Sequence, residues 1–97
     1  MRTFRLLKEA EREIRSGFSF YDAQSPGLGG DFAIEVRRLC RRICEYPELG
    51  TEVLPDIRRR LVRRFPYSIY YLVEDSEIVV LAIAHQNRKP RYWTSRS

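Results

Sequence analysis

The chain has 97 residues, of which 43% are hydrophobic and 32% charged, a balance typical of one folded globular domain and not of a disordered segment. No apolar run approaches the roughly 18 residues that a membrane span needs. The stretch from Met1 to Arg5 lacks the apolar core of a signal peptide, so we expect a cytoplasmic protein with no membrane partner.

The net charge of +5 is concentrated in the second half of the chain. Residues 57–97 hold nine Lys or Arg against three Asp or Glu, which leaves +6, whereas residues 1–56 hold nine against ten, which leaves −1. We therefore expect the second half to meet an anionic partner. Nucleic acid, a nucleoprotein complex and an acidic peptide all remain open.

The first half predicts a short strand followed by two helices. Phe4 and Leu6 alternate with polar neighbours, as in a strand. Apolar residues then recur every three or four positions, which predicts one helix over about residues 8–23 and a second ending near Glu45. The segment 24–30, with three glycines and a proline, separates them, so the helices should form a hairpin.

The second half predicts a linker and a β-meander. Residues 48–56 carry turn residues at both ends, and strands are expected over about 57–65, 69–73 and 78–85. In the first of these strands, Ile57, Leu61 and Phe65 should share one face.

The last predicted strand is apolar on both faces, so its outer face must be covered by the tail 86–97 or by another protein. We expect part of this surface to stay uncovered until an acidic partner segment packs on it. The fold class is α+β: an N-terminal strand and a two-helix hairpin packed on a small, mostly antiparallel sheet. It should form a single domain over residues 1–97, with 85–97 as a C-terminal tail.

The two cysteines, Cys40 and Cys44, lie four residues apart in the second predicted helix. That spacing is poorly suited to a disulfide, and the sole histidine, His85, is far away in sequence. We therefore expect reduced core cysteines, with no metal site and no cofactor.

Five arginines are concentrated between residues 58 and 64. Strand alternation predicts Arg58, Arg60 and Arg64 on one face, and Arg59 and Arg63 on the other. The guanidinium fork suits phosphate oxygens or carboxylates, which favours an anion-binding surface. The alternative is an edge strand whose charges prevent aggregation.

Aromatic residues adjoin the arginines and could stack on bases or on partner side chains. These candidates are Tyr67, Tyr70, Tyr71, Tyr92 and Trp93. Tyr71 shares a strand face with Ile69 and Val73, which favours the core, whereas Tyr70 lies on the opposite face. Structural packing is the alternative for each of them.

Three segments of the second half together resemble a known family. They are Arg64–Tyr71 (RFPYSIYY), Ile78–His85 (IVVLAIAH) and Arg88–Trp93 (RKPRYW), and the combination resembles the C-terminal half of RelE/ParE-superfamily toxins. In the first half, comparable residues are Ala10, Phe20-Tyr21, Gly27-Leu28-Gly29 and Tyr46-Pro47. The resemblance covers nearly the whole chain.

The resemblance implies the toxin of a bacterial type II toxin-antitoxin system, of the kind that serves plasmid stabilization and growth inhibition. It implies a cognate antitoxin whose acidic segment folds on the toxin, with operator DNA reached only through that antitoxin. The Phe65-Pro66-Tyr67 turn and the RKPRYW ending look closer to the ParE branch, whose members bind and poison DNA gyrase and are not enzymes.

Two alternatives stay open. A RelE-like protein would be a metal-independent endoribonuclease that cuts mRNA on the ribosome, with His85 as the general base. Its catalytic candidates would be Arg58, Arg64, Tyr70 and His85. The other alternative is an inactive relative that only binds its antitoxin.

The family also assigns the C-terminal tail a role in toxicity for several members. Pattern and resemblance together give the candidates for binding the target or the antitoxin. They are Arg58, Arg60, Arg64, Tyr67, Tyr70, Arg88, Arg91, Tyr92 and Trp93.

Overall fold

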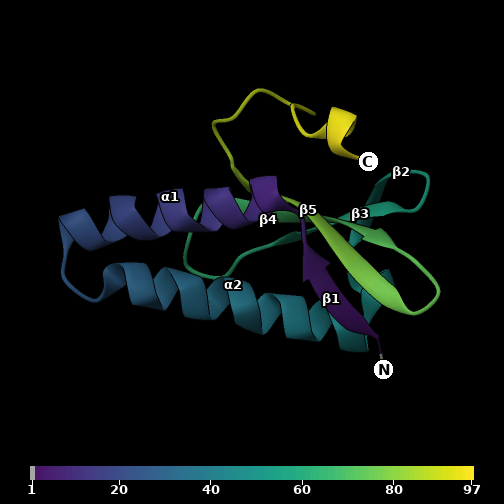
Figure 1. Cartoon of the computed structure of the whole chain (residues 1–97), viewed down its shortest axis with the longest axis horizontal. Helices are drawn as coiled ribbons and strands as arrows, with labels where there is room; N and C mark the ends of the chain where they lie inside the picture. Colours follow the sequence, from purple (N-terminus) through teal and green to yellow (C-terminus); the bar gives the residue numbers. More distant parts are fainter. Residues whose placement is uncertain (1) are drawn as a thin grey trace.

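Five strands form one sheet and two helices cover one of its faces in the computed structural model, which describes residues 2–97 (Figure 1). The elements in chain order are β1 (Thr3–Leu6), α1 (Lys8–Gln24), α2 (Leu28–Glu45), β2 (Thr51–Leu54), β3 (Ile57–Leu61), β4 (Tyr67–Val73) and β5 (Glu77–His85). Short 3-10 turns lie at Pro47–Leu49 and Thr94–Arg96.

The spatial order of the strands is β1-β5-β4-β3-β2. Strand β1 runs parallel to β5, and every other neighbouring pair is antiparallel. The predicted α+β fold, with a mostly antiparallel sheet and a helical hairpin, is confirmed. Among residues 2–97, no helix combines the length and the apolar character needed to cross a membrane.

The helical hairpin forms because small residues let the two helices approach closely. Gly17 of α1 lies against the ring of Phe32, and Gly29 of α2 lies against the backbone of Phe18. The carboxylate of Asp22 accepts hydrogen bonds from the N–H groups of Gly27 and Gly29, at 2.9 and 3.2 Å. These two bonds satisfy donors at the start of α2 and link it to the end of α1.

The main core lies between the hairpin and the inner face of the sheet. Its fully buried members include Phe32 and Val36 from α2 and Ile69 and Tyr71 from β4. The Tyr71 hydroxyl donates to the carbonyl of Pro47 at 2.7 Å, so this tyrosine is a core residue, as predicted.

Both cysteines are free and lie in this main core. Desolvation raises the pKa of the Cys40 thiol to about 12, so the thiol stays protonated at neutral pH.

A second, smaller core lies on the outer face of the sheet. Trp93, only 1% exposed, packs there with residues of β3 and β5, and its ring stacks on Tyr70 with the centroids 4.5 Å apart. Both faces of β5 are therefore buried, as the sequence indicates. The expectation that part of the outer face of β5 stays uncovered until a partner packs on it is wrong. The chain's own tail crosses β5 and covers this face (Figure 1).

Two predicted boundaries are also wrong. Residues 48–56 are not a plain linker, because Thr51–Leu54 pairs with β3 as β2 through a tight turn in which Asp56 has a φ of +64°. Strand β3 stops at Leu61 and not near 65, and Arg64 has a φ of +73°. Phe65 therefore packs in the main core, away from the face that carries Ile57.

The adjacent glycines 29 and 30 provide a test of the helix approach. Gly29→Ala should lower the free energy of unfolding by about 1–3 kcal/mol, because the added Cβ would collide with the carbonyl oxygen of Phe18. Gly30→Ala, where nothing lies within 4 Å, should raise it by up to about 1 kcal/mol through helix propensity. Urea denaturation measures both, and equal responses would contradict the close approach.

Candidate functional site

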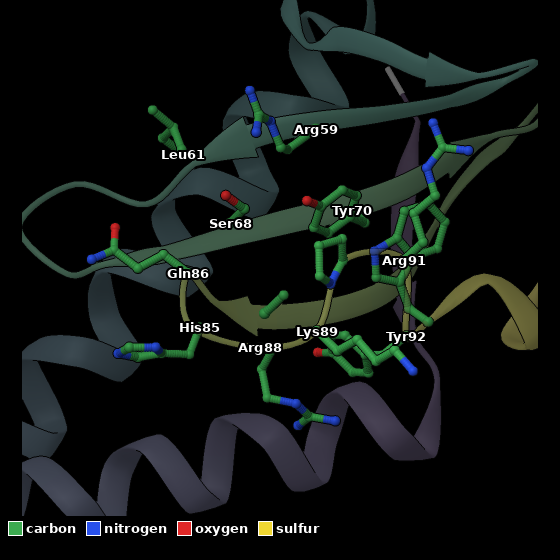
Figure 2. A pocket seen from close by; sticks show the side chains of 13 residues that line it. Arg59, Leu61, Ser68, Tyr70, His85, Gln86, Arg88, Lys89, Arg91 and Tyr92 are labelled. Carbon is green, nitrogen blue, oxygen red and sulfur yellow. The ribbon is translucent and has the colours of Figure 1, made fainter.

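A basic cleft lies on the outer face of the sheet, between β3, β4 and the segment that follows β5 (Figure 2). Its volume is about 380 Å³. Figure 2 shows Arg59 on β3 and Tyr70 on β4, with the labelled tail residues crossing β5 beside them. The cationic side chains that line this tail cleft are Arg59, Arg88, Lys89 and Arg91.

Local backbone bonds turn the chain back over the sheet after β5. The N–H of Gln86 donates to the carbonyl of Pro66 at 2.9 Å, and the N–H of Arg88 donates to that of His85 at 2.9 Å. Arg91 then takes a φ of +61°, which reverses the chain just before Trp93 enters the outer core. The tail residues are thereby held above β4 and β5.

The carboxylate of Glu13, on α1, anchors the tail. Its Oε1 accepts from the backbone N–H of Ile83 and from Nη1 of Arg96, both at 2.9 Å. Its Oε2 accepts from the Tyr92 hydroxyl at 2.5 Å and from Nη2 of Arg96 at 3.1 Å. Glu13 and Arg96 are only 13% and 14% exposed in their side chains, so this is a largely buried, fork-like ion pair.

The position of this anchor follows from the short first strand. Strand β1 pairs with β5 only as far as Val80, so the edge of β5 beyond that residue has no strand partner among residues 2–97. Glu13 satisfies the N–H of Ile83 on that edge, and Arg96 donates to the carbonyl of Leu81 at 3.0 Å. Helix and tail thus complete the hydrogen bonding of the central strand.

Tyr92 lies among the charges of this anchor. The guanidinium carbon of Arg88 lies 3.8 Å from the centroid of its ring, and that of Arg96 lies 5.0 Å away. Desolvation, followed by the hydrogen bond to Glu13, raises the pKa of Tyr92 well above its usual value of 10. The phenol therefore stays neutral at physiological pH and donates to the carboxylate.

Sequence reasoning missed Glu13. It is one of three glutamates in the first two turns of α1, and nothing in its type distinguishes it from Glu9 and Glu11. The spacing along α1 could have identified it. Glu13 lies three residues after Ala10 and four before Gly17, so it shares a helix face with these two buried residues. A carboxylate in a stripe of small buried residues has to find internal donors.

The cleft carries positive charge that the protein does not neutralise. Arg88 is 3.9 Å from Glu13, a long ion pair, and Arg59, Lys89 and Arg91 make none within residues 2–97. Lys89 and Arg91 are exposed. The cleft can therefore bind an anionic group, such as a phosphate or a carboxylate, beside the stacked rings of Tyr70 and Trp93.

The structure brings six of the predicted site residues to this cleft. They are Tyr70, His85, Arg88, Arg91, Tyr92 and Trp93. Trp93 is buried and supports the cleft from the outer core. Nδ1 of His85 accepts the N–H of Asn87 at 3.0 Å, so the neutral ring carries its proton on Nε2.

The other predicted residues lie elsewhere. Arg58 donates to the carbonyl of Gly50 at 2.8 Å on the inner side of the sheet. Arg64, beyond the end of β3, lies 3.6 Å from Asp31. Tyr67 packs on the ring of Phe32 at 4.7 Å in the main core.

The prediction that Arg58, Arg60 and Arg64 share one face is wrong for Arg64, because strand alternation stops with β3 at Leu61. Arg60 lies on the inner side of the sheet, where it faces α2. The arginines of residues 58–64 therefore do not form one patch.

The fold combines a strand and a helical hairpin with a five-stranded, mostly antiparallel sheet, and a family match over residues 4–90 places it in the class of the RelE/ParE-superfamily toxins. Within it, the family model described as "ParE toxin of type II toxin-antitoxin system, parDE" matches residues 4–90. The chain belongs to the ParE toxin family. The resemblance seen in the sequence is thereby confirmed.

A solved structure titled "Chromosomal ParDE TA system from P. aeruginosa" is similar in fold, with a TM-score of 0.76. The alignment covers 88% of this chain and 96% of that one at 17% sequence identity, so it supports the fold alone. No curated protein matches the sequence. The family match ends at Pro90, so Trp93 and Arg96 lie outside it.

The Glu13 anchor predicts that Glu13→Ala releases the tail. The change leaves Arg96 without its carboxylate and should lower the free energy of unfolding by about 2–4 kcal/mol. Trp93 is the only tryptophan, so its fluorescence reports the tail directly: emission should shift to the red and become accessible to a soluble quencher. Glu11→Ala, at an exposed position of α1, is the control and should leave both unchanged. Unaltered Trp93 emission in Glu13→Ala would contradict the anchor.

Proposed function

We propose that this type II toxin acts by binding and poisoning DNA gyrase, with the tail cleft as its target-binding surface, and that a cognate antitoxin neutralises it. Membership of the ParE family supports the toxin class. The observation that carries the choice of surface is a group of cations that make no ion pair within residues 2–97. Arg59 belongs to β3, and Lys89 and Arg91 belong to the tail that Glu13 anchors. A protein–DNA complex offers both phosphates and carboxylates to such a surface.

Binding is favoured over RNA cleavage because the suspected catalytic residues do not meet. Tyr70 and His85 line the tail cleft, whereas Arg58 and Arg64 lie outside it. The hydrogen bond to Nδ1 of His85 occupies the lone pair that a general base needs, and the proton on Nε2 blocks the other nitrogen. The cleft therefore has the charge to hold an anion, whereas its one histidine is engaged in a local hydrogen bond.

A ribonuclease remains the second candidate because of one observation. Tyr70 and His85 share the cleft with Arg59. A RelE-like activity would then place RNA across the same surface, with Arg59 near the phosphate.

Purified toxin should inhibit DNA supercoiling by gyrase, and the double variant Lys89→Glu/Arg91→Glu should weaken that inhibition by at least about tenfold, or about 1.4 kcal/mol. Both side chains are exposed, so the fold should survive their replacement. Arg12→Glu/Arg15→Glu, which reverses two exposed charges on α1, is the matched control and should inhibit like the parent. Inhibition should also weaken as salt is raised, because exposed charges are screened.

Expression without antitoxin separates the remaining alternatives. Gyrase poisoning should give DNA damage and filamentous cells, in agreement with the inhibition expected in the supercoiling assay. Rapid translation arrest with cleaved mRNA would replace this proposal by the ribonuclease. Normal growth with folded toxin would identify an inactive relative that only binds its antitoxin.

A further inference from the structure

A second hollow, of about 310 Å³, lies between α2 and β3. It is on the inner side of the sheet, opposite the tail cleft, since Arg59 and Arg60 point to opposite faces of β3. Four arginines line it, two from α2, one from β3 and one from the segment that follows β3. We call it the arginine pocket, and its cations are Arg38, Arg42, Arg60 and Arg63.

One carboxylate faces these four arginines. Glu35, largely buried, bonds Arg38 at 3.3 Å. Within residues 2–97, Arg42, Arg60 and Arg63 make no ion pair. The pocket lining therefore keeps three positive charges that the fold does not neutralise.

Among these four arginines, Arg60 gives the strongest indication of a ligand. Its Nη1 is buried and has no hydrogen-bond partner among the described residues. An unsatisfied buried donor costs about 1–3 kcal/mol, and more when the group is charged. A multi-oxygen anion entering the pocket would supply acceptors to this guanidinium fork.

The surroundings of the pocket favour a peptide over a nucleic acid. Leu61, on its rim, is 69% exposed, and Leu39 forms part of its wall. Strand β2 pairs with β3 only as far as Arg59, so the edge beside Arg60 has no strand partner among residues 2–97. A peptide can place a carboxylate in the hollow, an apolar side chain on Leu61 and its backbone along that edge.

We propose that the arginine pocket is the docking site for an acidic segment of the antitoxin, with Asp or Glu side chains inserted between α2 and β3 and an apolar residue on Leu61. The inference rests on the proposed neutralisation by an antitoxin and names where its acidic segment binds. It also assigns different arginines to the two functions, Arg59 to the target and Arg60 to the antitoxin, while Leu61 lines both hollows.

The probe is a short fluorescein-labelled peptide rich in glutamate and leucine, compared with a version in which glutamine replaces every glutamate. In fluorescence anisotropy, the full chain should bind the acidic peptide at least about tenfold more tightly than its glutamine version. Arg42→Gln/Arg63→Gln should remove that difference. Both arginines are exposed, so the fold should persist, and native Trp93 emission checks it.

Lys89→Gln/Arg91→Gln is the matched control, because it removes the same charge from the tail cleft. It should leave peptide affinity unchanged. Equal affinity for the two peptides, or loss of binding in the tail variant instead of the pocket variant, overturns the proposal. A DNA duplex should not compete with the peptide. If the duplex displaces the peptide and its own binding is lost in Arg42→Gln/Arg63→Gln, the proposal is overturned and the ligand is a phosphate. The anisotropy measurement contains no gyrase. A negative result in the supercoiling assay would therefore count against the proposed gyrase target and not against peptide binding in the arginine pocket.

Discussion

The ion pair between Glu13 and Arg96 is the contact on which the outer half of the molecule depends. It joins α1 to the last turn of the chain, and the same carboxylate holds the Tyr92 hydroxyl and the N–H of Ile83. Without it, the tail would keep its bonds to the carbonyls of Leu81 and Pro66 but would lose, within residues 2–97, its only carboxylate contact near Trp93, which covers the apolar outer face of β5. The tail cleft exists only while the tail is held, so the geometry of the proposed target surface depends on one buried carboxylate.

Strand β3 divides the positive charge of the second half between two surfaces. Alternation along the strand sends Arg59 to the tail cleft and Arg60 to the arginine pocket. A third arginine of the same run, Arg58, bonds to backbone carbonyls near the start of β2. Arginines that lie close together in the sequence therefore line two separate basic hollows and make one structural contact.

Periodicity was enough to predict the helices, the last two strands and the burial of both faces of β5, because these segments bury a repeating set of apolar side chains. It failed where local turns end a pattern. The strand Thr51–Leu54 has only four residues and lies between Gly50 and Pro55, two residues typical of turns, so the segment looked like a linker. The positive φ of Arg64 ends the strand alternation that was used to place the arginines on faces. Glu13 was missed because its partners, Tyr92 and Arg96, are about eighty residues away in sequence. The tail cleft could be anticipated as basic and aromatic, but the anchor that shapes it could not.

Because the tail covers the outer face of the sheet, an antitoxin does not have to supply hydrophobic cover for β5. A toxin that exposed the apolar side of β5 would need its partner for hydrophobic cover, and its free form would be prone to aggregate. Here Trp93 and its neighbours supply that cover within the chain. What the fold leaves unsatisfied is charge: the cations of both hollows and the buried Nη1 of Arg60. Apolar burial therefore stabilises the free chain, whereas the partner recognition proposed above depends on charge complementarity together with an apolar contact at Leu61. The apolar cover of the sheet's outer face therefore comes from within the chain and does not require a partner.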